Sequence, residues 1–126
     1  MKTETVGNAE METWSVDEVA QAWERDDVVL IDVRTPQEYM FEHIEGALLL
    51  PMSFFAAAKL PGQSDKRIVF LCGSGVRSGK VARRAAEAGI ARIAHMEGGF
   101  AAWKKAGMPY IGTDMATGAP RRVEGT

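Results

Sequence analysis

Cysteine and histidine are scarce in this sequence. The 126 residues include one cysteine, Cys72, and two histidines, His43 and His95. One cysteine cannot form an intramolecular disulfide, and a zinc site or a CxxC redox pair needs more thiols than the chain has. A free thiol is typical of a reducing compartment, so we expect a cytoplasmic protein with no metal site.

Long apolar runs and an excess of one charge are also missing. The net charge is −2, and lysine and arginine are not concentrated in one block, so no electrostatic footprint for nucleic acid is present. No stretch approaches the roughly 20 apolar residues that span a bilayer. The N-terminal stretch MKTETVGNAE lacks the apolar segment of a secretory signal. We therefore expect neither a nucleic-acid partner nor a membrane.

Two capping boxes predict where helices begin. Ser15 with Glu18, and Thr35 with Glu38, have the spacing at which a hydroxyl and a carboxylate satisfy each other's backbone N–H groups. Helical patterns are predicted over residues 15–25, 35–42, 53–60, 77–88 and 100–105.

Short aliphatic runs predict buried strands at residues 28–31 and 67–71, with a further short strand at 92–96. Strands that alternate with helices indicate an α/β domain with a mainly parallel sheet. We expect this domain over residues 14–110. The polar segments on either side are predicted to be a flexible N-terminal segment (1–13), with at most a short edge strand, and a mobile C-terminal tail (111–126).

The loop after the strand at 67–71 has the composition of an anion cradle. Cys72 is followed by Gly-Ser-Gly-Val, then by Arg77 and Ser78. Glycines let successive N–H groups converge, the next helix contributes its positive end, and Arg77 adds a charge. A thiolate is favoured in such a field, so Cys72 is predicted to be a nucleophile. The alternative, a small buried apolar side chain, predicts apolar residues after the cysteine.

A second polar group ends the strand at 28–31. Asp32 and Arg34 are expected near the same site, because ligands bind beyond the carboxyl ends of parallel strands. They either orient the loop and strengthen the anion field, or form a local salt bridge, such as Arg34 with Glu38. Both histidines are interpreted as structural.

Three segments resemble the signatures of rhodanese-domain sulfurtransferases. The stretch from Cys72 to Ser78 resembles the family's active loop, C-x-x-G-x-R-S. The DVRTPQEY stretch at 32–39, continuing through HIEGA at 43–47, resembles its first signature, and GGFAAWKKAGMP at 98–109 resembles its last. Glu42 replaces a usual glycine, and Leu49 a common asparagine.

The resemblance implies a three-layer α/β/α fold with a sheet of about five strands, and a thiosulfate sulfurtransferase. In the implied reaction, Cys72 takes the outer sulfur of thiosulfate as a persulfide and passes it to cyanide, a thiol or an acceptor protein. The cradle would comprise Gly73, Ser74, Gly75, Val76, Arg77 and Ser78, and no cofactor is required. The donor is expected to be thiosulfate rather than mercaptopyruvate because Arg77 supplies a further positive charge. The chain is expected to be a monomer or a homodimer.

Two other function classes stay open. A cysteine phosphatase or arsenate reductase of the same fold places five residues between cysteine and arginine, whereas four separate Cys72 from Arg77. A non-catalytic sulfur carrier or regulatory binding module is the other alternative, although such relatives commonly lack the cysteine that this chain keeps.

Overall fold

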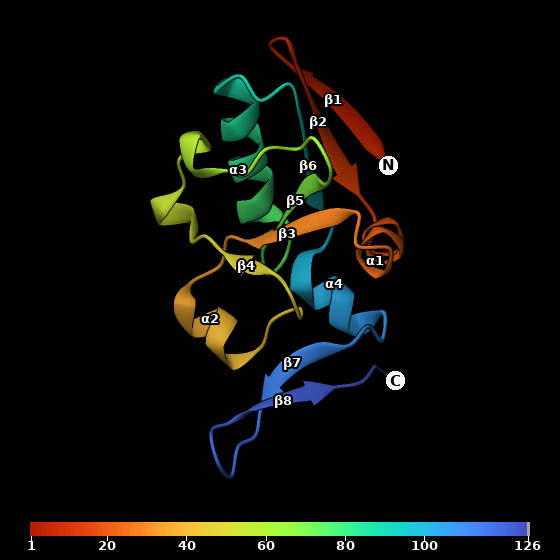
Figure 1. Cartoon of the computed structure of the whole chain (residues 1–126), viewed down its shortest axis with the longest axis vertical. Helices are drawn as coiled ribbons and strands as arrows, with labels where there is room; N and C mark the ends of the chain where they lie inside the picture. Colours follow the sequence, from red (N-terminus) through yellow and green to blue (C-terminus); the bar gives the residue numbers. More distant parts are fainter. Residues whose placement is uncertain (126) are drawn as a thin grey trace.

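A six-stranded sheet runs through the centre of the computed structural model, which describes residues 1–125 (Figure 1). Its strands, in spatial order, are β1 (Lys2–Val6), β2 (Ala9–Trp14), β6 (Arg92–Met96), β5 (Arg67–Leu71), β3 (Val28–Asp32) and β4 (Leu48–Leu49). Within this sheet, β1 and β2 pair antiparallel, and the other neighbouring strands pair in parallel. The prediction of a mainly parallel α/β sheet is confirmed.

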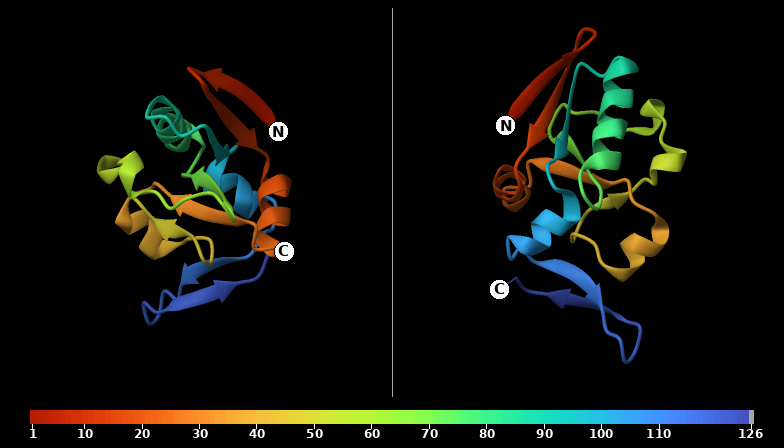
Figure 2. Two further views of the ribbon diagram at one scale, coloured as in Figure 1. Left: turned by 45° about the horizontal axis from the view of Figure 1, so that its top comes forward. Right: turned by 180° about the vertical axis from the view of Figure 1, so that it is seen from behind.

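Helices cover both faces of this sheet. Helices α1 (Val16–Glu24) and α4 (Gly99–Lys105) pack on one face, and α3 (Val76–Glu87) packs on the other. Helix α2 (Pro36–Phe41) lies near β4 (Figures 1 and 2). The helix predicted over 53–60 is instead two short 3₁₀ turns, η1 (Met52–Phe54) and η2 (Ala57–Lys59), which end in extended residues.

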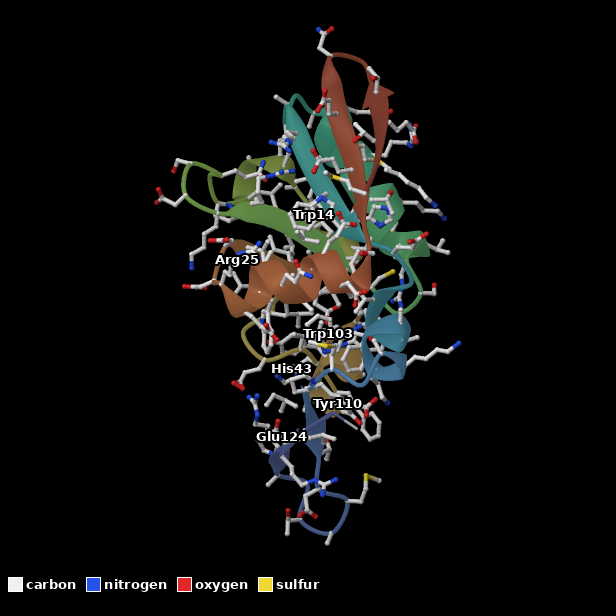
Figure 3. The ribbon with its side chains drawn as sticks, turned by 90° about the vertical axis from the view of Figure 1, so that its right-hand side faces the viewer. Trp14, Arg25, His43, Trp103, Tyr110 and Glu124 are labelled. Carbon is white, nitrogen blue, oxygen red and sulfur yellow. The ribbon has the colours of Figure 1, made fainter. Side chains whose placement is uncertain are left out.

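The apolar strands separate two hydrophobic cores. Leu30 and Val69 pack with α1 and α4, whereas their neighbours Ile31 and Phe70 pack with α3. Since successive side chains of a strand point to opposite faces, a strand covered on both sides must be apolar at every position. Figure 3 shows Trp103 of α4 between α1 and the chain near the labelled Tyr110.

Both predicted capping boxes are confirmed. The Ser15 hydroxyl accepts a hydrogen bond from the Glu18 N–H at 3.2 Å, and the Glu18 carboxylate accepts one from the Ser15 N–H at 3.0 Å. Thr35 and Glu38 repeat this arrangement at 3.2 and 3.1 Å. These contacts satisfy N–H groups at the start of each helix, and they place α2 directly after β3.

The predicted flexible segment 1–13 instead forms β1 and most of β2. Strand β2 pairs in parallel with β6 and extends the sheet. The segment looks polar because β1 is mostly exposed and β2 contains the buried Glu12. The Glu12 carboxylate accepts hydrogen bonds from Trp14 at 2.9 Å, from Arg67 at 3.0 Å and from Arg92 at 2.6 Å. A buried carboxylate is tolerated only with such partners, and the two arginines come from distant parts of the chain.

The predicted mobile tail 111–126 is also largely structured. Strands β7 (Tyr110–Thr113) and β8 (Pro120–Val123) form an antiparallel hairpin at the lower end of the molecule (Figure 1). The hairpin is attached by a β-bridge between His43 and Ile111. Arg122 also forms an ion pair with Glu45. The last residue of that segment, Thr126, lies outside the described residues. Within residues 1–125, no helix has the length and apolar character needed to cross a membrane.

Candidate active site around Cys72

The thiol of Cys72 lies at the carboxyl end of β5, inside a tight turn that leads into α3. Cys72 is completely buried, and the Gly75 N–H donates to its Sγ at 3.0 Å. Gly75 has a φ of +100°, and a β-carbon there would lie 3.2 Å from the backbone nitrogen of Gly98. Glycine therefore provides both the left-handed turn and the space that bring the N–H to the sulfur.

Two opposing effects act on the pKa of the Cys72 thiol. Burial raises it, because the thiolate loses the stabilisation that water provides. Hydrogen bonds from the backbone and hydroxyl of Ser78 and from the N–H groups of Ser74 and Gly75 lower it by more. The resulting pKa lies below the ordinary value, which favours the thiolate.

The first residues of α4 form hydrogen bonds with the backbone of the Cys72 loop. The Phe100 N–H donates to the Cys72 carbonyl at 2.7 Å, and the Ala101 N–H donates to the Gly73 carbonyl at 3.1 Å. A β-carbon on Gly99 would overlap the carbonyl oxygen of Cys72 and lie 2.7 Å from the carbonyl carbon of Gly73. Gly99, which the sequence placed only within the family's last signature, thus allows α4 to approach the loop.

Arg77 is paired with a carboxylate. Its Nη1 and Nη2 donate to the Glu38 Oε1 and Oε2 at 2.8 and 3.0 Å. This bidentate contact lowers the pKa of Glu38 to about 2 and raises the pKa of Arg77. The sequence offered Arg34 with Glu38 as one example of a local salt bridge, but Glu38 pairs with Arg77, and the local salt bridge of Arg34 is with Asp32. The pair connects the Cys72 loop to the capping box of α2.

Asp32 and Arg34 form a buried pair of their own. The Asp32 carboxylate accepts hydrogen bonds from the Arg34 backbone N–H at 3.0 Å, from Nε at 3.0 Å and from Nη2 at 2.8 Å. Nη2 also donates to the Glu42 carbonyl at 2.6 Å, and the guanidinium lies 4.6 Å from the centroid of the Phe100 ring. The hydrogen bonds between Asp32 and Arg34 fix the turn after β3, and the Arg34 guanidinium connects this turn to Phe100 at the start of α4.

A chain of polar side chains extends from the thiol into the protein. The Ser78 Oγ lies 3.6 Å from the Cys72 Sγ and 3.0 Å from the Nδ1 of His95. On the other side of the imidazole, Nε2 lies 3.2 Å from the Thr13 Oγ1. The sequence placed Ser78 in the site, but it assigned His95 to packing and Thr13 to a flexible segment. No sequence signal links them, because α3, β6 and β2 meet only in the folded sheet.

The groove beside the loop has a volume of about 450 Å³. Its walls include Val33, Met52, Phe54, Arg77 and Arg84. A cavity of about 500 Å³ near Val6 and Ala86 belongs to the far end of α3 and not to the Cys72 loop. Across residues 1–125, no three His, Cys, Asp or Glu side chains gather into a group that could hold a metal ion.

Comparisons with known proteins agree on one family. The Rhodanese-like domain model matches residues 15–106. An uncharacterized protein of Synechocystis sp. is 42% identical over 96 residues, which cover 76% of this chain and 54% of that protein. This chain therefore spans about half the length of that relative.

Two further matches cover most of both chains. The thiosulfate sulfurtransferase GlpE of Pseudoalteromonas translucida is 30% identical over 92 residues, which cover 73% of this chain and 88% of GlpE. The crystal structure of a rhodanese-like domain protein from Staphylococcus aureus superimposes with a TM-score of 0.64 at 31% identity, covering 74% of this chain and 91% of that one. The match over residues 15–106 and the shared fold show that this chain belongs to the rhodanese-like domain family.

Proposed function

We propose that this protein is a thiosulfate sulfurtransferase in which Cys72 carries the transferred sulfur as a persulfide. The observation that carries this proposal is the environment of the thiol, which is buried beside the Gly75 N–H at 3.0 Å and has a lowered pKa. A thiolate stabilised in this way can attack without a separate general base. The name of the relative GlpE agrees with the proposal.

In the first half-reaction, the Cys72 thiolate attacks the outer sulfur of thiosulfate. A new S–S bond forms, the bond between the two donor sulfurs breaks, and its electron pair leaves with sulfite. The terminal sulfur of the persulfide then carries the negative charge. We assign Gly73, Ser74, Gly75, Val76 and Ser78 to the cradle around it, since N–H groups at the start of a helix stabilise an anion.

In the second half-reaction, a nucleophilic acceptor attacks the terminal persulfide sulfur. Cyanide would leave as thiocyanate, and a thiolate would leave as a persulfide, in both cases restoring the Cys72 thiolate. Atoms and charge balance without an oxidant, so the chain's own residues suffice for this scheme. Because the donor product leaves before the acceptor reacts, the kinetics should be ping-pong.

The donor is assigned from the charges beside the loop. Two of the five N–H donors of Arg77 face Glu38, and we assign the remaining donors to the sulfonate oxygens of thiosulfate. Arg84 lines the same groove as Arg77 and supplies a second cation there. Two cations suit a donor that carries two negative charges.

The size of the loop argues against phosphoryl chemistry. Only four residues separate Cys72 from Arg77, and the Gly75 N–H is already in contact with the sulfur. A tetrahedral phosphoryl group needs a wider ring of N–H donors. The contact therefore favours a single terminal sulfur atom as the bound group.

Intact-protein mass spectrometry after thiosulfate treatment tests the proposal. The wild type should gain the mass of one sulfur atom and lose it when cyanide is added, and Cys72→Ser should gain nothing. An unchanged wild-type mass would favour a binding module, and hydrolysis of an aryl phosphate that depends on Cys72 would favour a phosphatase. Faster turnover with mercaptopyruvate than with thiosulfate would overturn the donor assignment alone.

A further inference from the structure

The imidazole of His95 lies in the interior of the protein and takes no part in the sulfur transfer described above. Its side chain projects from β6 against the first turn of α3, and only 8% of His95 is exposed. A β-carbon at Gly79 of α3 would lie 3.4 Å from the imidazole Cε1, an ordinary van der Waals distance, so α3 packs directly against the ring.

The Ser78 hydroxyl has one proton but lies near three possible hydrogen-bond acceptors. It lies 3.6 Å from the Cys72 Sγ, 3.3 Å from the Gly75 carbonyl and 3.0 Å from the His95 Nδ1. A thiolate and a carbonyl oxygen can only accept hydrogen bonds, whereas a neutral imidazole nitrogen either donates or accepts. The single proton of Ser78 is therefore shared among three acceptors, or between the thiolate and the Gly75 carbonyl when Nδ1 is itself a donor.

The tautomer of His95 decides whether the imidazole is one of these acceptors. When Nδ1 carries the proton, it donates to the Ser78 oxygen and leaves the Ser78 proton free for the thiolate. Nε2 is then an acceptor, and the Thr13 hydroxyl at 3.2 Å can donate to it. With the proton on Nε2, Nδ1 would take the Ser78 proton, and the thiolate would lose its hydroxyl donor.

We propose that His95 and Thr13 are positioning residues for the nucleophile: Thr13 sets the imidazole tautomer, and His95 directs the Ser78 hydroxyl toward the Cys72 thiolate. The inference concerns the same site as the proposed sulfur transfer and rests on it for its functional meaning. The four side chains form one path from β2 through β6 and α3 to the loop after β5.

The charge state of the imidazole agrees with this role. Burial lowers the pKa of His95, and the nearby Glu97 raises it by less, so the ring is neutral near pH 7. Arg77, at the end of the loop, is already paired with Glu38 of α2. His95 therefore acts by hydrogen-bond direction and not by placing a positive charge near the sulfur.

The pH dependence of Cys72 alkylation by iodoacetamide tests the network without any sulfur donor. Ser78→Ala should raise the midpoint by about one pH unit, because it removes a hydrogen bond to a charged group. His95→Phe should raise it similarly, since the phenyl ring has no donor. His95→Asn should keep the midpoint closer to the wild-type value, because its amide N–H can lie near the position of Nδ1.

Two substitutions of Thr13 form a matched pair that tests the role of its hydroxyl. Thr13→Val keeps the shape of the side chain and removes the hydroxyl, whereas Thr13→Ser keeps the hydroxyl. The valine variant should shift the midpoint in the same direction as His95→Phe, and the serine variant should match the wild type. Equal midpoints for the valine and serine variants would overturn the proposal, even if His95→Phe failed to fold.

The outcomes also separate this inference from the proposed function. If alkylation shifts as described but thiosulfate leaves no sulfur on Cys72, the network stands and the sulfurtransferase assignment fails. If Cys72 takes up sulfur but alkylation in the His95 and Thr13 variants follows the wild-type profile, these two residues only fill space.

Discussion

Gly99 is where α4 comes closest to the backbone of the Cys72 loop. It has a φ of +61°, and an added β-carbon would overlap the Cys72 carbonyl oxygen and lie 2.7 Å from the carbonyl carbon of Gly73. Gly99→Ala should therefore push α4 away from the loop. Two hydrogen bonds depend on this approach, from Phe100 to Cys72 and from Ala101 to Gly73.

The expected loss of stability follows from three contributions. The left-handed backbone costs an alanine about 1–2 kcal/mol, and the reduced freedom of the unfolded chain offsets about 0.4–1 kcal/mol of this. Losing the two backbone hydrogen bonds adds about 1 kcal/mol for each. We expect Gly99→Ala to lower the free energy of unfolding by about 3 kcal/mol, which is a large share of a typical domain's stability.

Gly89→Ala is the matched control. Gly89 also has a positive φ, +103°, but no atom lies within 4 Å of its added β-carbon. In Gly89→Ala only the backbone strain should act, and the free energy of unfolding should fall by about 1 kcal/mol. Urea unfolding should distinguish the variants, and Gly99→Ala should also form less Cys72 persulfide with thiosulfate. Equal losses of stability, with wild-type sulfur loading in both, would refute this account of the loop.

Two further predictions concern the charged pairs beside the loop. Asp32→Asn should lower the free energy of unfolding, measured in urea, by about 3 kcal/mol, because it leaves the Arg34 guanidinium buried without its counter-charge. A loss below about 0.5 kcal/mol would count against the importance of this pair. Because Arg77 lowers the pKa of Glu38 from 4.5 to about 2, the stability from that carboxylate should be complete above pH 4.5 and lost as the pH falls toward 2. Glu38→Gln should therefore unfold at a lower temperature than wild type near neutral pH, and this difference should close in acid; a constant difference would contradict the assignment.

Local sequence signals predicted much of the fold. The capping boxes at Ser15 and Thr35 marked helix starts, because a cap needs only residues that are three positions apart. The apolar runs of β3 and β5 indicated buried strands for a similar reason. In the site, the small residues after Cys72 predicted a turn of converging N–H groups, and Gly75 supplies one of them.

Long-range pairings were beyond local signals. The hairpin of β1 and β2 looked polar because β1 is mostly exposed and β2 buries Glu12, whose charge is balanced by Arg67 and Arg92 from other strands. The C-terminal hairpin likewise depends on contacts such as the bridge between His43 and Ile111. Neither arrangement leaves a period that a short window can detect.

The sequence alone determined that a single cysteine stands in a glycine-rich turn between a buried strand and a helix, because backbone preference and helix polarity act over a few residues. Tertiary structure decided which groups surround that cysteine. It paired Arg77 with Glu38, brought Gly99 against the loop and connected Ser78 to His95. These contacts join residues far apart in the chain, so they exist only once the strand order of the sheet is set.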